Sequence, residues 1–259
     1  MNRLVSPNTE TFSPQVVVKD VSLGASAAAA DRFAEKIATT SDCVLGLATG
    51  GTPRDFYRLL AERDLCFSGV TTFNLDEYVG LAHDHPQSYR SYMRTHLFEK
   101  VGLDDRQTHF PVATSPTSDL QLAGAAYEKE IAAAGGIDLQ LLGIGRNGHI
   151  AFNEPGASRT SRTRVVHLTE STIDANARFF DNRDQVPRQA ISMGIASILD
   201  AKEIAVLAFG KQKSAAVAAS LHGPVDASCP ASFLRLHPNV TWYLDRDAMT
   251  SSSTEKSNA

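Results

Sequence analysis

The feature that most constrains the fold is a repeated alternation of short apolar runs with amphipathic, Ala-rich segments. The apolar runs are residues 15–20, 43–49, 70–76, 137–145, 164–169, 203–210 and 239–245. Segments between them keep apolar residues three and four positions apart, as helices do: 25–38, 53–63, 86–101, 121–135 and 212–223. Runs such as "VLGLA" and "LQLLGI" are apolar at consecutive positions, which is typical of central parallel strands covered on both faces. The sequence therefore predicts an α/β fold, a doubly wound, mainly parallel and Rossmann-like sheet with helices on both faces.

Composition favours one large domain. The chain has 259 residues, of which 42% are hydrophobic and 21% charged, enough for a substantial core. No Pro/Gly/Ser-rich linker interrupts the alternation, so we expect a single α/β domain over residues 1–248 and a disordered polar tail over 249–259. Cys43, Cys66 and Cys229 are widely spaced and lack metal-site spacing, and we expect small buried side chains rather than a disulfide framework or a zinc site.

The charge and hydropathy of the chain argue against nucleic acid and membranes as binding partners. The formal net charge is −4 and the basic residues are scattered, so the chain lacks the stripe that binding to nucleic acid or to an anionic membrane requires. The N-terminus has no apolar core of signal-peptide length, and the apolar runs are too short to span a bilayer. We therefore expect a cytoplasmic protein with a small-molecule ligand.

In doubly wound sheets, ligands bind outside the carboxyl ends of the strands, so residues that follow strands are the candidates. The first such cluster is "ATGGTPRDF", with Thr49, Gly50, Gly51 and Thr52 in a turn before a helix. We predict that Pro53 is the first helical residue and Thr52 the N-cap. Glycines and free N–H groups at a helix start suit a phosphate, although neither a Walker nor a GxGxxG pattern is present and an ordinary βα turn is the alternative.

The second cluster is "FNLDEYVG", where Asp76 and Glu77 follow a strand. Adjacent side chains on an extended backbone point to opposite sides, so only one of the two acids is expected to face the site, and that carboxylate is a candidate base. The alternative is that both cap the next turn. The nearby His83, Asp84 and His85 are metal-ligand types, but on an exposed loop before a proline they are better interpreted as a solvated helix entry.

The third cluster is "GIGRNGHIAFNEP", residues 143–155, after the run "IDLQLLGI". His149 can exchange protons near neutral pH, Glu154 can fix its tautomer, and Asn147 can position the ring. The spacing does not fit two metal ligands on one helical face, so a metal site is disfavoured. Packing in the core or on the surface is the alternative for a lone histidine.

The fourth cluster is "FGKQKSAAV", where Lys211 and Lys213 are predicted to open a helix. Cations are misplaced at a helix N-terminus unless an anion binds there, although solvated lysines are the alternative. Together the clusters indicate a phosphate cradle, a carboxylate base and a His–Glu pair, with no nucleotide, metal, cofactor or nucleophile signature. This chemistry is proton transfer on a small phosphorylated metabolite, and it leaves isomerase, lactonase and deaminase open.

At these motifs the chain resembles the glucosamine-6-phosphate deaminase (isomerising) family, from about residue 43 to 245, through "LATGGTP", "TTFNLDEYVGL", "HPQSYRSYM", "GIGRNGHIAFNEPG", "SRTR", "ARFFDN" and "LHPNVTWYLD". The resemblance implies conversion of glucosamine 6-phosphate and water to fructose 6-phosphate and ammonia, without a cofactor. It implies that Asp76 moves a proton between C2 and C1 and that His149 opens the sugar ring, assisted by Glu154 and Asn147. The implied substrate-binding residues are Thr49, Gly50, Gly51, Thr52, Arg178 and Lys213.

Two departures from the family pattern affect regulation and pH dependence. Asn147 stands where some members have Asp; it adds no negative charge, so a different pH dependence is expected. Allosterically activated hexameric members carry Ser and Lys where this chain has Ala157 and Val166, so we expect no activation by N-acetylglucosamine 6-phosphate. The sequence leaves a monomer and a homo-oligomer open. Residues 155–190 are the expected lid, because they are loop-rich and contain Arg178.

Two other functions share this fold. A 6-phosphogluconolactonase has a similar Gly-rich, His-containing loop but lacks the combination of "NLDEYVG" and "FNEP". A non-catalytic sugar-phosphate sensor of the kind found in bacterial regulators would add a basic helix-turn-helix segment, for which the short N-terminal extension has no room.

Overall fold

A computed structural model describes residues 10–112, 120–178 and 180–250. Its strands are β1 (Gln15–Lys19), β2 (Val44–Leu47), β3 (Thr71–Asn74), β4 (Asp76–Tyr78), β5 (Thr108–His109), β6 (Leu139–Gly143), β7 (Arg164–His167), β8 (Gln189–Ser192), β9 (Ile204–Ala208) and β10 (Val240–Asp245). Its α-helices are α1 (Ser22–Thr39), α2 (Arg54–Ala61), α3 (Tyr89–Met93), α4 (Glu99–Val101), α5 (Leu120–Ala133), α6 (Glu170–Ala177), α7 (Ile195–Leu199), α8 (Ser214–His222) and α9 (Arg246–Met249). A π-helical turn (Arg94–Phe98) joins α3 to α4, and 3₁₀ turns span Arg183–Gln185, Lys211–Lys213 and Pro230–Leu236.

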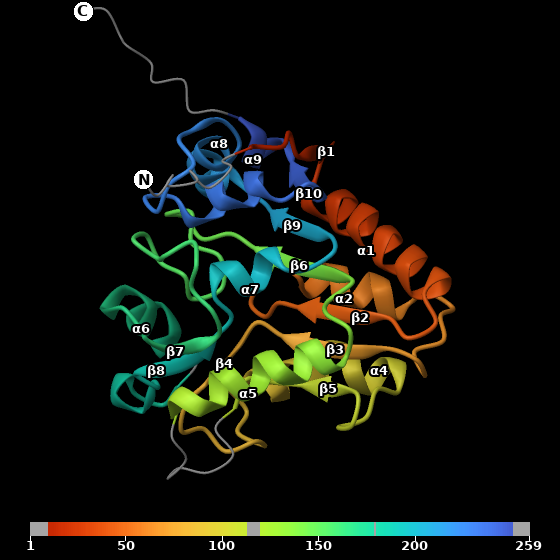
Figure 1. The fold of residues 1–259 in the computed structure, drawn as a ribbon, viewed down its shortest axis with the longest axis vertical. Helices are drawn as coiled ribbons and strands as arrows, with labels where there is room; N and C mark the ends of the chain where they lie inside the picture. Colours follow the sequence, from red (N-terminus) through yellow and green to blue (C-terminus); the bar gives the residue numbers. More distant parts are fainter. Residues whose placement is uncertain (1–9, 113–119, 179, 251–259) are drawn as a thin grey trace, which may run out of the picture.

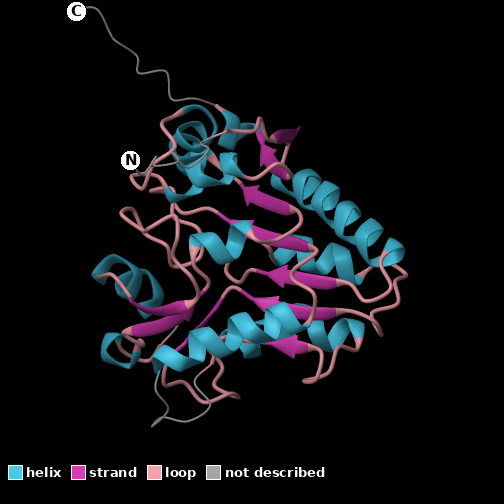
Figure 2. Ribbon diagram, in the orientation of Figure 1, coloured by secondary structure: helices cyan, strands magenta, loops and turns pink. Residues whose placement is uncertain are grey.

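The central sheet has the strand order β1-β10-β9-β6-β2-β3-β5, and its neighbouring strands are parallel (Figures 1 and 2). The predicted parallel α/β sheet is therefore confirmed. The run at 164–169 forms a strand as expected but does not join this sheet. It is β7 of a separate antiparallel sheet, with the order β4-β8-β7. An apolar run predicts a strand, whereas its pairing is set by distant partners that the run itself does not reveal.

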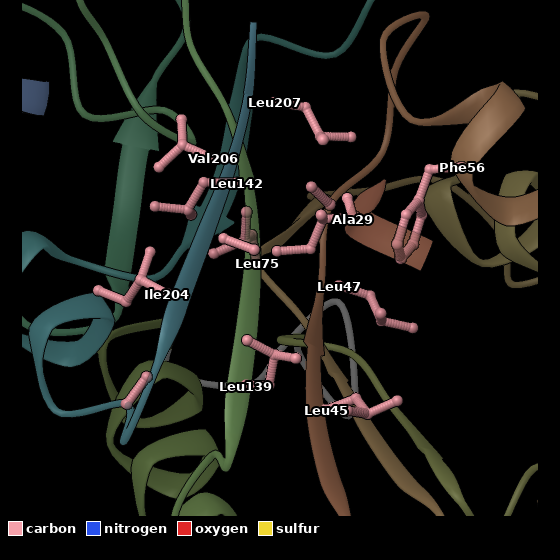
Figure 3. Close-up of a cluster of buried hydrophobic side chains, with 14 of the residues drawn as sticks. Ala29, Leu45, Leu47, Phe56, Leu75, Leu139, Leu142, Ile204, Val206 and Leu207 are labelled. Carbon is pink, nitrogen blue, oxygen red and sulfur yellow. The ribbon is translucent and has the colours of Figure 1, made fainter. Parts of the chain in front are cut away.

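Helices cover both faces of the central sheet, and the alternation along β2 shows how. Leu45 and Leu47 are fully buried on the side of the sheet where Phe56 of α2 lies (Figure 3). Gly46 faces the other way, where a Cβ atom would collide with the side chain of Gln140. On that second face, Tyr127 of α5 packs edge-on against Phe73 of β3, with ring centroids 5.6 Å apart.

The antiparallel sheet has a small core of its own beside the carboxyl edge of the central sheet. Its buried residues are Tyr78, Leu168, Ile173, Val186 and Ala190. β4 begins one residue after Leu75, whose carbonyl accepts a hydrogen bond from Met193 N. The chain that leaves β3 therefore passes directly into the second sheet, and the carboxyl end of β3 lies between the two cores.

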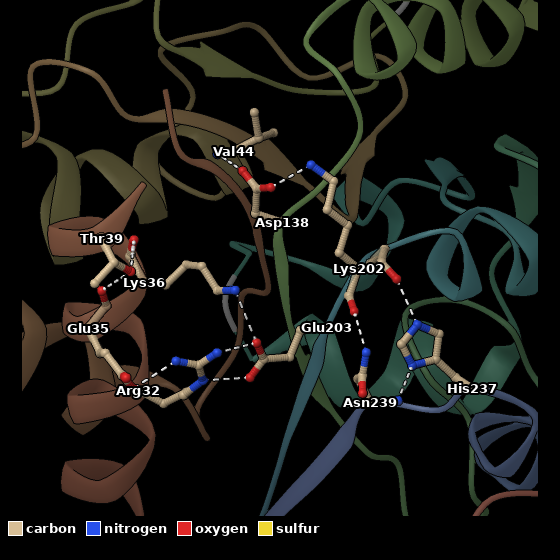
Figure 4. A network of polar contacts seen from close by, with 11 residues as sticks. Arg32, Glu35, Lys36, Thr39, Val44, Asp138, Lys202, Glu203, His237 and Asn239 are labelled. Carbon is tan, nitrogen blue, oxygen red and sulfur yellow. Dashed lines mark hydrogen bonds and ion pairs between the residues drawn. The ribbon is translucent and has the colours of Figure 1, made fainter. Parts of the chain in front are cut away.

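A polar network lies at the amino ends of the parallel strands, the edge away from the expected site (Figure 4). The Asp138 carboxylate accepts a hydrogen bond from Val44 N at 2.8 Å and pairs with Lys202 at 2.7 Å. Glu203 accepts a hydrogen bond from Arg32 Nε of α1 at 2.7 Å. These charged groups pair with one another, and Asp138 also bonds to the first backbone N–H group of β2. Their role is therefore structural.

Two of the three cysteines are buried, and the last helix ends close to the C-terminus. Cys43 and Cys229 are buried as expected, whereas Cys66 is exposed, so that expectation was wrong for one thiol. α9 ends at Met249, and the tail from residue 251 lies outside the described residues. Within the described part of the chain, no helix is long and apolar enough to cross a membrane.

Candidate active site

A pocket of about 280 Å³ lies at the carboxyl edge of the central sheet, after β2, β3, β6 and β9. It gathers residues from all four predicted clusters: Thr49, Gly50, Gly51, Thr52, Asp76, His149, Glu154 and Lys213. Two predicted residues do not line it, Asn147 and Arg178. Segments far apart in sequence thus meet where parallel strands end, as the topology predicts.

The glycine loop follows β2 and forms one wall of the pocket. Gly50 has φ +108°, a conformation that favours glycine. The predicted N-cap is wrong by one residue. Helix α2 begins at Arg54, and Pro53 is the N-cap, because its carbonyl accepts the first helical hydrogen bond from Tyr57 N. Thr52 lies one residue before the N-cap, and it lines the pocket.

Asp76 and Glu77 lie on opposite sides of β4, as an extended backbone requires. Glu77 turns away from the pocket and accepts hydrogen bonds from the backbone N–H groups of Tyr78, Tyr89 and Arg90, so it holds the start of α3. Asp76 lines the pocket with only 7% of its surface exposed. Burial, reinforced by the negative charge of Glu77, raises the pKa of Asp76 to about 8.

His149 and Glu154 face each other across the tight loop that follows β6. The distance from His149 Nδ1 to Glu154 Oε2 is 3.4 Å. The ion pair with His149, together with the hydrogen bond from Asn147 and the nearby Thr172 side chain, lowers the pKa of Glu154. Gly145 is required beneath the ring, because a Cβ atom there would lie 2.3 Å from His149 Nδ1.

Asn147 acts on this pair differently from our expectation. Its Nδ2 donates to Glu154 Oε2 at 2.7 Å, and its Oδ1 accepts from the backbone N–H of His149 at 3.2 Å. The side chain therefore fixes the carboxylate and the turn rather than contacting the imidazole, because a short amide side chain bonds readily to the backbone two residues on. Ala151 lies between His149 and Glu154 with φ +49°, a left-handed conformation that turns the chain back.

The two predicted phosphate cations lie on either side of the glycine loop. Lys211 begins a 3₁₀ turn and Lys213 ends it as the N-cap of α8, so both lysines lie at the start of a helix as predicted. Lys213 Nζ donates to Ile144 O at 2.7 Å, and burial together with the charge of Arg146 lowers the pKa of this lysine. Arg178 lines an adjacent pocket of about 710 Å³ that shares Gly50 and Gly51 with the first.

The structure adds residues that the sequence did not single out for the site. Thr172 of α6 lines the pocket, and its side chain helps to lower the pKa of Glu154. Tyr89 of α3 lines both pockets. Neither follows a strand of the central sheet, so the rule that selected the other candidates did not reach them. The pair of histidines at residues 83 and 85 lies outside this pocket, and His85 Nδ1 accepts a hydrogen bond from Gln87 N.

One open pocket thus combines a buried carboxyl, a His–Glu pair, the glycine loop and an ammonium group. In the described residues, no group of three or more His, Cys, Asp or Glu side chains is placed to hold a metal ion. The Asp76 carboxyl and the His149 imidazole are groups that can each exchange a proton with a molecule in this pocket.

Comparison with known proteins decides the family. Residues 19–242 match the family model described as glucosamine-6-phosphate isomerases/6-phosphogluconolactonase. The chain is 57% identical over 228 residues to the glucosamine-6-phosphate deaminase of Rhodopirellula baltica, a span that covers 86% of this chain and 90% of that protein. The chain belongs to the glucosamine-6-phosphate deaminase family. Glucosamine-6-phosphate deaminase 1 of Giardia intestinalis is 52% identical over 224 residues, which cover 85% of this chain and 84% of that protein.

Solved structures agree with membership in this deaminase family. A monomeric glucosamine-6-phosphate deaminase superposes with a TM-score of 0.85 at 44% identity, covering 90% of this chain and 98% of that one. The 6-phosphogluconolactonase of Trypanosoma cruzi has a TM-score of 0.75 at 21% identity, covering 95% and 100%. The second likeness shows the fold alone. The protein is thus an enzyme of the deaminase family on an α/β fold that is also found in lactonases.

Proposed function

We propose that the protein converts glucosamine 6-phosphate and water to fructose 6-phosphate and ammonia. The observation that carries the proposal is the single pocket in which buried Asp76, the His149–Glu154 pair and the glycine loop face one another. Deaminases more than 50% identical support the same reaction.

Ring opening is the first step, because only the open-chain aldehyde makes the C2 hydrogen acidic. We assign this step to His149, which accepts the proton of the anomeric hydroxyl and returns a proton to the ring oxygen. Glu154 lies 3.4 Å from Nδ1 and its negative charge stabilises the imidazolium that forms. Asn147 keeps the Glu154 carboxylate in place through its 2.7 Å hydrogen bond.

Proton transfer between C2 and C1 is assigned to Asp76. In its ionised form the carboxylate removes the C2 proton while O1 takes up a proton, which gives an enolamine, and the resulting acid then returns its proton to C1. The C2 iminium that forms adds water, and ammonia and one proton leave as the C2 carbonyl forms, which balances the overall reaction. Burial supports this role, since a desolvated carboxylate with a pKa of about 8 is a far stronger base than an exposed one.

The phosphate group is assigned to the glycine loop and the cations beside it. Gly51 and Thr52 line the pocket together with Lys213, and Arg178 lines the adjacent pocket together with Gly50 and Gly51. Small-residue backbone and flanking cations form a typical cradle for phosphate.

The decisive experiment measures ammonia and fructose 6-phosphate released from glucosamine 6-phosphate by the purified protein and by Asp76→Asn. We expect equal amounts of both products and a loss of roughly 10²- to 10⁴-fold in the variant, the range that general acid–base catalysis contributes. Asp138→Asn is the matched control, because it alters a buried acid at the opposite edge of the sheet and should retain turnover. Hydrolysis of 6-phosphogluconolactone without deamination would instead identify a lactonase, and inactivity toward both would favour a sensor.

A further inference from the structure

Two tyrosine hydroxyls hold the glycine loop after β2. Tyr57 of α2 donates to Ala48 O at 2.6 Å, and Tyr92 of α3 donates to Gly50 O at 2.6 Å. Their rings pack edge-on with centroids 6.5 Å apart. Among the described residues, no other hydrogen bond reaches the carbonyl of Gly50, and a Cβ atom built on Gly50 or Gly51 would meet nothing within 4 Å. The loop therefore has little packing of its own and depends on these two bonds.

The bond to Gly50 O sets the orientation of a whole peptide unit. A trans peptide is planar, and its C=O and N–H groups point in opposite directions. The described peptides include no cis bond. Because Gly50 O is directed at Tyr92, the N–H of Gly51 is directed away from Tyr92. Gly51 lines the pocket with Asp76 and His149, whereas Tyr92 lines only the adjacent one.

Tyr92 is well placed to act as a permanent donor. Burial raises the pKa of its hydroxyl above the usual value for tyrosine, so the proton stays on the oxygen at neutral pH. The positive charge of Arg54 partly opposes this rise, and the ring packs on His96 with centroids 4.3 Å apart. The hydroxyl proton is therefore available for the 2.6 Å hydrogen bond to Gly50 O.

Helix α3 connects this contact to the acid pair. Glu77 holds the first backbone N–H groups of α3, and Tyr92 lies on the next turn. Strand β4 therefore has two roles. It places Asp76 in the pocket, and through Glu77 it fixes α3, whose Tyr92 in turn holds the glycine loop.

We propose that Tyr92 is a positioning residue for phosphate recognition: through the carbonyl of Gly50 it holds the Gly50–Gly51 peptide so that the Gly51 N–H faces the pocket. This inference rests on the proposed function, which supplies a phosphorylated substrate. Tyr92 does not contact the reacting atoms in this arrangement. Its loss should weaken phosphate binding and leave the chemical step nearly unchanged.

Tyr92→Phe tests the inference, because it removes the hydroxyl and keeps the ring. We expect KM for glucosamine 6-phosphate to rise about threefold to tenfold, the effect of losing one hydrogen bond, with kcat within about twofold. The Kd for inorganic phosphate, measured by calorimetry, should rise by a similar factor. Tyr127→Phe is the matched control, since its hydroxyl donates to Asn74 O at the same 2.6 Å but lies outside the loop. Tyr57→Phe is the second variant of the loop and should also weaken phosphate binding.

Each result has a defined meaning. An unchanged phosphate Kd in folded Tyr92→Phe, or an equal rise in Tyr127→Phe, would overturn the positioning role. If Tyr92→Phe does not fold, the phosphate Kd of Tyr57→Phe decides whether these hydroxyls orient the loop. Phosphate binding that depends on Tyr92, in a protein that does not deaminate glucosamine 6-phosphate, would support this inference and overturn the proposed reaction.

Discussion

Asp76 is buried without compensating hydrogen bonds, and this destabilises its charged form while it makes the carboxylate more basic. It is buried beside a second acid, and no described residue donates a hydrogen bond to its carboxylate. Glu77, by contrast, accepts three hydrogen bonds that favour its charged form. Desolvation without compensation makes Asp76 basic. The sequence predicted that only one acid of the pair would enter the site, because alternation along a strand requires it. The degree of burial depends on the second sheet, which the two residues alone do not reveal.

The basicity of Asp76 predicts a pH-dependent stability. Its pKa is about 8 in the folded protein and about 4 in an unfolded chain, so the folded state holds the proton more tightly. This contribution is fully present below about pH 4 and is lost as the pH rises to about 8, at up to about 1.4 kcal/mol per pH unit. Asp76→Asn, which cannot ionise, should therefore gain stability relative to the wild type as the pH rises.

Urea unfolding of both proteins at several values between pH 5 and pH 9 measures this difference. The free energy of unfolding of Asp76→Asn minus that of the wild type should increase up to about pH 8 and then level off. Parallel pH profiles for the two proteins would contradict an unusually basic Asp76.

At the scale of elements, α6 joins the proton-transfer pair to the phosphate end of the site. Thr172 of α6 lines the pocket with Glu154, and Arg178 directly follows the helix. The Thr172 side chain helps to lower the pKa of Glu154, so Thr172→Val, which removes the hydroxyl, should raise that pKa. The carboxylate then becomes protonated at a higher pH, and the acidic limb of the kcat/KM profile should move upward in pH, with kcat falling about threefold to tenfold at neutral pH.

The matched control for this prediction is Asp174→Asn, because Asp174 is an exposed residue of the same helix that pairs with Arg183. Its profile should coincide with that of the wild type. An acidic limb that stays in place in Thr172→Val would show that Thr172 has no influence on the Glu154 carboxylate during turnover.

Helices and strands could be predicted from sequence where the local hydrophobic pattern is strong. Short strands could not, because they form only by pairing with strands far away in the sequence. The seven apolar runs all became strands, but β4, β5 and β8 are only two to four residues long and carry no periodicity of their own. The predicted lid over 155–190 contains β7, α6 and part of β8, so much of it is regular structure with a separate small core. Its movement stays a prediction.

At the scale of the whole molecule, the topology accounts for most of the site. Parallel strands with carboxyl ends at one edge bring four separate clusters together, and this gathering could be predicted from sequence. Contacts from helices could not. Tyr92 reaches Gly50 across 42 positions in the chain, and that contact follows from how α3 packs rather than from any motif. Arg178 was expected from the family motif instead, and it lines the adjacent pocket together with Gly50 and Gly51.

Allosteric regulation is also a property of the whole molecule. Members activated by N-acetylglucosamine 6-phosphate have Ser and Lys where this chain has Ala157 and Val166. Ala157 packs against the main core and Val166 against the small one, and neither side chain offers a donor to a phosphorylated effector. Activation also requires a second site whose occupancy biases the first. We therefore expect initial rates to follow a hyperbolic dependence on glucosamine 6-phosphate, with kcat unchanged by N-acetylglucosamine 6-phosphate at any concentration. Steady-state rates with and without that compound test this, and a sigmoidal curve that the compound makes hyperbolic would contradict it.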